Sequence, residues 1–105
     1  MKTGENRINK ISKQDFDAVQ AEGASIFETI SDNICKGFES DEVQWQIVKW
    51  RKWLDNFADY SDEAIGGLGQ AYSHYPQFTK VFRAINEDLP EFLTKAIEYY
   101  CAHKK

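Results

Sequence analysis

Apolar residues recur at separations of three and four along most of this chain, and that spacing places them on one face of an α-helix. The first such series consists of Phe16, Val19, Gly23, Ile26, Phe27, Ile30 and Ile34. No run of alternating apolar and polar residues between turn residues indicates a β-strand. We therefore expect an all-α fold, a single compact domain of about five helices joined by short connections.

Helix-capping residues set the expected boundaries. Ser40 and Ser61 are each followed by two acidic residues. A serine hydroxyl can cap the free amides at the start of a helix, and the helix dipole favours carboxylates in the first turn. Pro76 suits a first helical position, where no amide proton is needed, and Gly37 is a typical helix stop. The expected helices run from Ser12 to the Lys36–Gly37 stop, from Ser40 to about Ala58, from Ser61 to near His74, from Pro76 through Ile85, and from around Asp88 onward.

Composition and charge narrow the class of protein. With 105 residues, 42% of them apolar and 29% charged, the chain has the composition of one soluble globular domain. No apolar run reaches the roughly 20 residues of a membrane-spanning helix, so we expect no membrane partner. The net charge of −4 offers no basic surface for phosphates, so we expect no nucleic-acid binding by this chain alone. Residues 1–11 are polar, and we interpret them as a flexible N-terminal segment of a cytoplasmic protein.

The sequence contains no recognisable catalytic or metal-binding motif, so we do not expect an enzyme. Cys35 and Cys101 lack metal-ligand spacing, and we expect free, buried thiols. His74 lies at a predicted helix end and His103 near the C-terminus, where a solvated or capping histidine is more typical than a haem ligand. We therefore expect no metal, haem or other cofactor.

Three glycines, Gly66, Gly67 and Gly69, fall inside the third predicted helix. A phosphate-binding loop would need a preceding strand and a following Gly-Lys-Ser/Thr sequence, and neither is present. Each glycine costs a helix about 1 kcal/mol relative to alanine. The sequence therefore indicates that another helix, or a bound ligand, packs closely against this backbone.

Aromatic residues are numerous for so small a chain, with seven Phe, five Tyr and three Trp. At about 100° per residue, Trp50 and Phe57 follow the core stripe of the second helix, Trp53 lies at its edge, and Trp45 points nearly opposite. An apolar flank of Trp45 and Trp53 is typical of a ligand cleft or a partner surface; alternatively, the first or last helix covers it. The aromatic residues assigned to the core also include Phe16, Phe27 and Phe92.

Several short segments together resemble one known family. They are Lys10–Phe16, Ala21–Gly23, Trp50–Leu54, Gly67–Tyr72, Pro76–Thr79, Leu89–Leu93 and Ala96–Ile97. Their order and spacing from Asn9 onward are similar to those of TipAS, the antibiotic-recognition domain of thiostrepton-induced, MerR-type transcription activators. By this resemblance, residues 12–105 are a TipAS-like helical ligand-binding domain.

The resemblance implies a globin-like arrangement without haem, in which a hydrophobic cleft between helices receives a bulky amphipathic antibiotic, often a peptide. It also implies that DNA binding belongs to a winged helix-turn-helix that precedes this domain in the full regulators. On this interpretation the chain is either the effector-binding part of such a regulator or a stand-alone member that sequesters the drug.

One position departs from the founding member of that family. There, a cysteine in the turn corresponding to Asp59–Ser61 adds to a dehydroamino acid of the antibiotic. Tyr60 takes this position here, and a phenol is mostly protonated and a poor nucleophile at neutral pH. We therefore expect reversible, non-covalent binding.

The cleft is expected to be lined or bordered by aromatic residues of the second to fourth helices. These are Trp50, Trp53, Phe57, Tyr60, Tyr72, Phe78 and Phe82. The alternative function is a protein-interaction module that receives a partner helix, or forms a homodimer, through Trp45 and Trp53.

Overall fold

The computed structural model describes residues 13–103, which form five α-helices and no strand. The α-helices are α1 (Lys13–Asp32), α2 (Asp41–Trp53), α3 (Asp62–His74), α4 (Pro76–Ile85) and α5 (Leu89–His103). Two single-turn 3-10 helices, η2 (Ile34–Lys36) and η3 (Leu54–Asn56), follow α1 and α2. The expected all-α, single-domain fold is confirmed. The expected start at Ser12 and the N-terminal segment 1–11 lie outside the described range.

Three predicted helix starts are confirmed, two of them by a serine cap and the third by a proline at the first helical position. The Ser40 hydroxyl accepts a hydrogen bond from the Val43 amide at 3.3 Å, and the Ser61 hydroxyl accepts one from Ala64 at 3.1 Å. Pro76 is the first residue of α4. Serine hydroxyls thus satisfy amides that have no partner within the helix.

The first two helices end earlier than predicted, because asparagine side chains compete for the last carbonyl groups. Asn33 donates its side-chain amide to the Thr29 carbonyl, and Asn56 donates to the Trp53 carbonyl, each at 2.8 Å. These bonds favour a tighter turn over another α-helical turn. A 3-10 turn then leads to Gly37, whose φ of 92° is readily adopted only by glycine.

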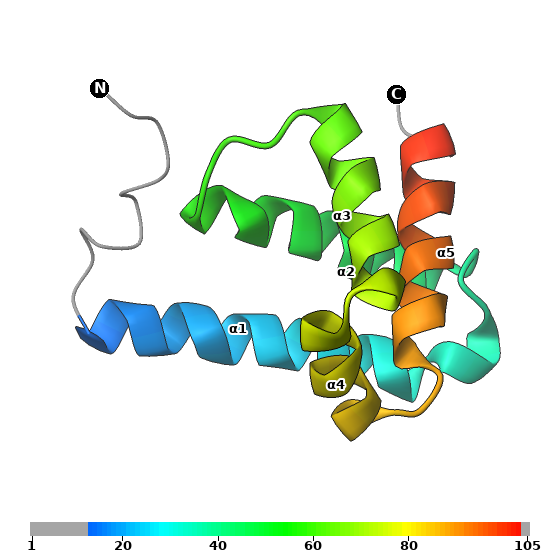
Figure 1. Ribbon diagram of the computed structural model, residues 1–105, viewed down its shortest axis with the longest axis horizontal. Helices are drawn as coiled ribbons and strands as arrows, with labels where there is room; N and C mark the ends of the chain where they lie inside the picture. The colour runs from blue at the N-terminus through cyan, green and yellow to red at the C-terminus, as the bar shows by residue number, and fades with distance from the viewer. Residues whose placement is uncertain (1–12, 104–105) are drawn as a thin grey trace.

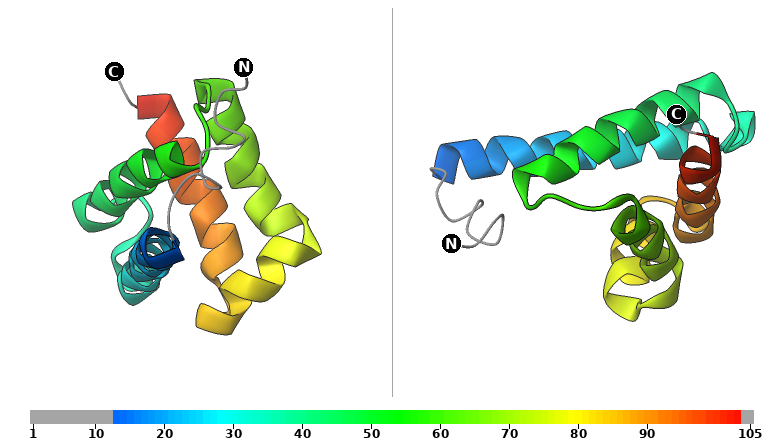
Figure 2. Two further views of the ribbon diagram at one scale, coloured as in Figure 1. Left: turned by 90° about the vertical axis from the view of Figure 1, so that its left-hand side faces the viewer. Right: turned by 90° about the horizontal axis from the view of Figure 1, so that it is seen from above.

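The helices form two groups that cross each other. Figure 1 shows α1 and α2 running side by side in opposite directions, with α3 and α5 also antiparallel and packed against each other. The views in Figure 2 confirm both pairings and show α4 connecting the second pair at the end nearest α1. None of the helices within residues 13–103 is long and apolar enough to cross a membrane.

All five helices contribute to one hydrophobic core. Its buried apolar residues are Ile26, Phe27, Ile30, Val43, Ile47, Trp50, Leu54, Ile65, Tyr72, Phe82, Leu89, Leu93, Ala96 and Ile97. Phe27 was correctly assigned to the core, and Phe92 is half-buried at its edge. The assignment of Phe16 was wrong: it is half-buried near the free end of α1, which extends past α4.

Cys35 is a free thiol, as expected, but its predicted burial was wrong, because it is exposed. The expectation rested only on how often cysteine is buried, and Cys35 belongs to η2, which has no buried residue. Cys101 is half-buried on α5. The two histidines are exposed, and a ring nitrogen of His103 lies 2.9 Å from the Tyr99 carbonyl in the last turn of α5.

Of the glycines in α3, one allows a close approach between helices. A Cβ atom at Gly69 would lie 2.8 Å from Cγ2 and 3.0 Å from Cβ of Ile97 on α5. Cβ of Ile97 is fixed to the backbone, so the two helices would have to separate. Gly66 and Gly67 have no such neighbour within 4 Å. The expected close packing of another helix is therefore present at Gly69.

We predict opposite effects on stability for two glycine-to-alanine substitutions in α3. Gly69→Ala should lower the free energy of unfolding by about 1 to 3 kcal/mol, because the added methyl group overpacks the contact with Ile97. Gly67→Ala, at an exposed position of the same helix, should raise it by up to about 1 kcal/mol through helix propensity. Urea unfolding followed by circular dichroism measures both. A gain in stability for Gly69→Ala would contradict the proposed packing.

Candidate functional site

A pocket of about 350 Å³ opens where α1, the end of α2, α3 and α4 meet. Its lining residues are Gln20, Gly23, Ala24, Phe27, Trp53, Phe57, Tyr72, Phe78, Val81, Phe82 and Ile85. None of these side chains is charged, and Gln20 supplies the only amide. The pocket therefore suits an uncharged, apolar group.

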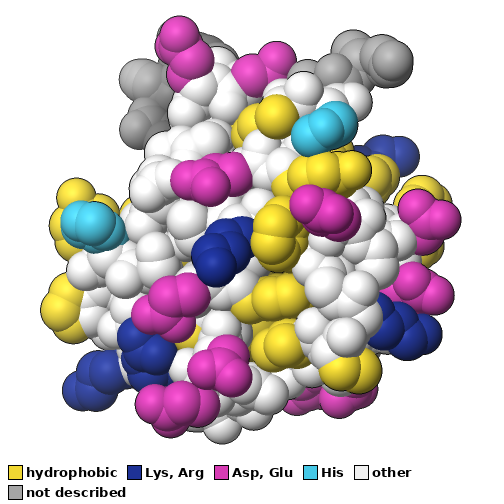
Figure 3. All heavy atoms as spheres, turned by 90° about the vertical axis from the view of Figure 1, so that its right-hand side faces the viewer, with side chains coloured by type: hydrophobic (Ala, Val, Ile, Leu, Met, Phe, Trp, Pro, Cys, Tyr) yellow, Lys and Arg dark blue, Asp and Glu magenta, His cyan; other side chains and the backbone are white. Residues whose placement is uncertain are grey.

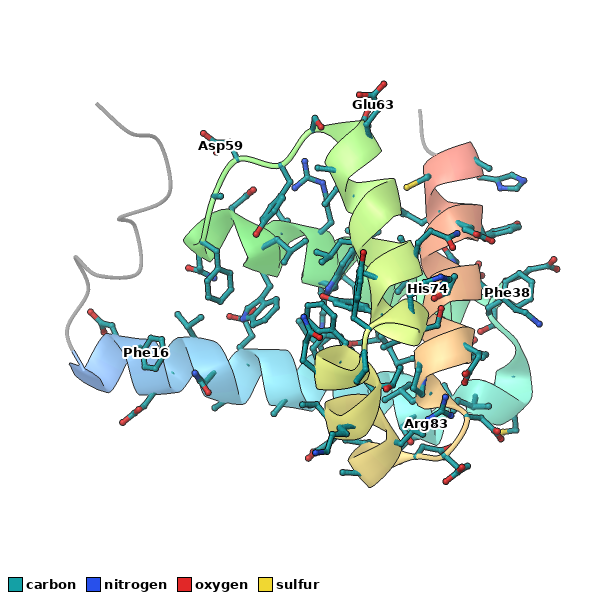
Figure 4. The ribbon with its side chains drawn as sticks, in the orientation of Figure 1. Phe16, Phe38, Asp59, Glu63, His74 and Arg83 are labelled. Carbon is teal, nitrogen blue, oxygen red and sulfur yellow. The ribbon has the colours of Figure 1, made fainter. Side chains whose placement is uncertain are left out.

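Aromatic rings from three helices meet edge to face along the wall of the pocket. The ring centroid of Phe82 on α4 lies 4.8 Å from Phe27 on α1 and 4.8 Å from Tyr72 on α3. Phe78 lies 5.1 Å from Tyr72. Edge-to-face contacts contribute free energy in addition to that from the buried apolar area. The rings therefore hold one another in place, and the wall is formed without a ligand. Figure 4 shows side chains filling the space between α1, α3 and α4.

Trp53 attaches α1 to the end of α2 at the edge of the pocket. Its indole nitrogen Nε1 donates a hydrogen bond of 2.8 Å to the Val19 carbonyl. Gly23, one turn later, leaves room for the ring, because a Cβ atom there would overlap Cζ2 and Cε2 of the indole. The apolar stripe of α1 thus includes a glycine where the aromatic ring of α2 packs.

Tyr72 lies between the pocket and the core. Its ring lines the pocket, whereas its buried hydroxyl accepts a hydrogen bond of 3.2 Å from Nε1 of Trp50. Burial raises the pKa of the Tyr72 phenol to about 12, because the phenolate would lose its hydration. The group therefore stays neutral at physiological pH, which keeps this wall of the pocket uncharged.

The structure brings five of the seven predicted site residues together around the pocket. The residues that line it are Trp53, Phe57, Tyr72, Phe78 and Phe82. Trp50 does not, because it is fully buried in the core. Tyr60 does not line it either: it is half-buried, and its backbone carbonyl accepts a hydrogen bond of 2.8 Å from Arg51.

The contribution of α1 to the pocket was not predicted. No residue of this helix was predicted to line the site, and Phe16 and Phe27 were assigned to the core, yet Gln20, Gly23, Ala24 and Phe27 line the pocket. Gly23 was the available signal, since a glycine within an apolar stripe indicates that something large packs there. Val81 and Ile85 on α4 were also missed, because only aromatic residues of that helix were predicted to line the cleft.

The expected flank of Trp45 and Trp53 does not form, because the two rings have different surroundings. Trp53 is half-buried beneath α1, in agreement with the alternative that the first helix covers it. Trp45 is 58% exposed, and the Lys49 ammonium lies 5.9 Å from its ring centroid. No group of His, Cys, Asp or Glu within residues 13–103 is arranged to hold a metal ion.

Comparison with known proteins gives one family and one curated relative. Residues 1–100 match the TipAS antibiotic-recognition domain family. The HTH-type transcriptional activator mta of Bacillus subtilis (strain 168) is 28% identical over 102 residues, which cover 96% of this chain and 40% of that protein. The chain therefore spans less than half the length of this relative. No solved structure matches the chain.

We predict that the hydrogen bond of Trp53 contributes to stability. Trp53→Phe should lower the free energy of unfolding by about 1 to 2 kcal/mol, because it removes the donor to Val19 and part of the ring over Gly23. Trp45→Phe, at an exposed position of the same helix, should change it by less than about 0.5 kcal/mol. Urea unfolding followed by circular dichroism measures both. Equal effects would contradict the role of Trp53.

We also predict that Tyr72 makes stability depend on pH in the alkaline range. Because its pKa is raised in the folded state, the unfolded chain releases this proton first, near pH 10, and stability is lost as pH rises toward 12. Between pH 9 and pH 11 the wild type should lose about 1.4 kcal/mol more than Tyr72→Phe. Urea unfolding at both pH values measures the difference.

The matched control for this prediction is Tyr75→Phe, since Tyr75 is 53% exposed. This variant should keep the pH dependence of the wild type. Tyr72→Phe is expected to be less stable at neutral pH, because Trp50 loses its acceptor, so only the slope with pH tests the prediction. The same slope in Tyr72→Phe and the wild type would overturn it.

Proposed function

The chain belongs to the TipAS antibiotic-recognition domain family, and we propose that it binds a bulky amphipathic, thiopeptide-like antibiotic reversibly in the pocket between α1 and α4. The observation that carries the proposal is the uncharged, aromatic-lined pocket. A pocket of about 350 Å³ lies at the small end of the range for ligand sites. It would therefore hold an apolar segment of a large antibiotic, with the polar remainder on the protein surface.

The position of the cysteines supports non-covalent binding. Neither Cys35 nor Cys101 lines the pocket, and Cys35 lies in η2, outside the elements that form it. Tyr60 occupies the turn in which the family's founding member has its reactive cysteine. A thiolate is therefore missing at the place where it could attack a bound dehydroamino acid.

The relative supports a proposed role in transcription regulation, because this chain matches 40% of the length of that activator. In such a regulator the domain would be the effector-binding part, and a ligand that binds one conformation better would shift the attached DNA-binding part toward its active state. As a separate chain, the domain would sequester the drug. Neither role involves catalysis or a cofactor.

We propose to test ligand binding by titrating thiostrepton while recording tryptophan emission and native mass spectra. Because Trp53 lines the pocket, binding should change its emission, and the complex should dissociate under denaturing conditions. The change should disappear in Trp53→Phe and persist in Trp45→Phe. An added mass that survives denaturation would contradict reversible binding.

A variant that fills the pocket tests its location. Ala24 is exposed and lines the pocket, so Ala24→Phe should occupy the pocket without leaving a cavity in the core. It should weaken binding at least about tenfold, which corresponds to about 1.4 kcal/mol. Ala18→Phe, at an exposed position of α1 that does not line the pocket, should bind like the wild type. Equal affinities for both variants would place the ligand elsewhere.

A further inference from the structure

A second aromatic surface lies where α5 meets the segment between η2 and α2. Its rings are Phe38, Phe92, Tyr99 and His103, and we call it the Phe38 surface. The ring centroid of Phe38 lies 6.5 Å from Phe92 and 6.1 Å from Tyr99, and Tyr99 stacks on His103 at 4.0 Å. None of the four side chains is fully buried, and none lines the antibiotic pocket.

The Phe38 surface is held in place by a hydrogen-bonded side chain. The side-chain amide of Gln44 donates to the Phe38 carbonyl at 2.7 Å and to the Ala96 carbonyl at 3.1 Å. Gln44 therefore ties the segment that carries Phe38 to the middle of α5. A surface fixed in this way loses little conformational freedom when a partner binds.

Two hollows lie along this surface. One of about 500 Å³ is bordered by Phe38 and Phe92, and another of about 240 Å³ by Tyr99 and His103. From Phe92 to His103 the α5 axis rises about 16 Å, or about three helical turns. The surface is thus an elongated strip of rings and hollows rather than a closed pocket.

Carboxylates outnumber cations along the strip. Those that line the two hollows are Glu39, Asp41, Glu87, Asp88 and Glu91. Among the described residues, the two cations that line these hollows are Arg83, which is paired with Glu91 at 2.7 Å, and Lys95, which lines the same hollow as Glu87 and Asp88. In Figure 3, hydrophobic side chains run down the middle of this face, with acidic side chains on both sides and Lys and Arg side chains among them.

We propose that the Phe38 surface binds an amphipathic α-helix of about three turns, whose apolar ridge packs on Phe92 and Tyr99 and whose flanks carry lysine or arginine. The apolar rings provide the contact area, as in other helix-in-groove complexes. The excess of carboxylates selects basic flanks. This surface includes neither Trp45 nor Trp53, and its use does not depend on antibiotic binding.

The same charges argue against other occupants. A nucleic acid would bring phosphates against Glu39, Asp41 and Glu87. A second copy of the domain, packed through the same face about a two-fold axis, would place like charges opposite each other. A helix with an apolar ridge and basic flanks complements both the rings and the carboxylates.

The test uses a leucine–lysine amphipathic peptide of about 18 residues, long enough to form a helix in water, and nitrogen-15 NMR spectra of the domain. We expect the largest shifts at Phe38, Phe92 and Tyr99, and weaker binding at higher salt. A matched peptide with glutamate in place of every lysine should not bind. Shifts centred on residues of the antibiotic pocket, or none at all, would overturn the proposal.

Charge-reversal variants show whether the carboxylates of the Phe38 surface bind the peptide or whether the net charge of the domain attracts it. The double variant Glu39→Lys/Glu87→Lys should weaken peptide binding about tenfold. The matched control Glu22→Lys/Glu63→Lys has the same net charge at exposed positions outside the Phe38 surface and should stay within about twofold of the wild type. Equal losses in both double variants would mean that net charge alone attracts the peptide, and would overturn the proposal.

Two further variants complete the test. Tyr99→Ala removes a ring that is only partly buried, and it should also weaken peptide binding about tenfold; an unchanged affinity would contradict the apolar ridge. Ala24→Phe, which fills the antibiotic pocket, should leave peptide binding intact, so failure at one site is distinguishable from failure at the other. If sedimentation shows a dimer of the domain that Tyr99→Ala dissociates, the occupant is a second copy and the basic helix is wrong.

Discussion

The burial of Tyr72 is the constraint on which the centre of this structure depends. A phenol removed from water needs a partner for its hydroxyl, and here the partner is the indole nitrogen of Trp50, from a different helix. The ring of Tyr72 also contacts Phe27, Phe78 and Phe82, which come from α1 and α4. One side chain therefore aligns four helices, and the same ring forms part of the pocket wall. The core and the proposed binding site are consequently not independent.

The outer edge of the pocket depends on a second arrangement, in which Trp53 packs on α1. Gly23 provides the space and the Val19 carbonyl provides the acceptor, so the indole fixes the position of α1 relative to α2. On the other side of the fold, Gln44 fixes the Phe38 segment on α5 in a comparable way. Both proposed binding surfaces are thus formed by side chains that join two elements through hydrogen bonds to backbone carbonyls.

Features that depend on residues close together in the sequence could be predicted, whereas most features that depend on distant residues could not. Ser40 and Ser61 cap amides three residues away, so the starts of α2 and α3 could be predicted from short segments. The ends of α1 and α2 were missed, although Asn33 and Asn56 act just as locally, because the apolar periodicity continues through them. Trp50 could not be separated from the pocket residues, since its phase on α2 is the same whether α3 or a cavity lies opposite.

The sequence by itself determined that the chain is all-α, where three of its helices begin, and that its aromatic residues exceed the needs of a small core. These properties depend on residues three or four positions apart, whose relative placement is the same in any helix. Only the tertiary structure decided which rings are core, which line a pocket and which stay exposed. Those outcomes rest on pairs such as Val19 with Trp53 and Gly69 with Ile97, which meet because whole helices pack together.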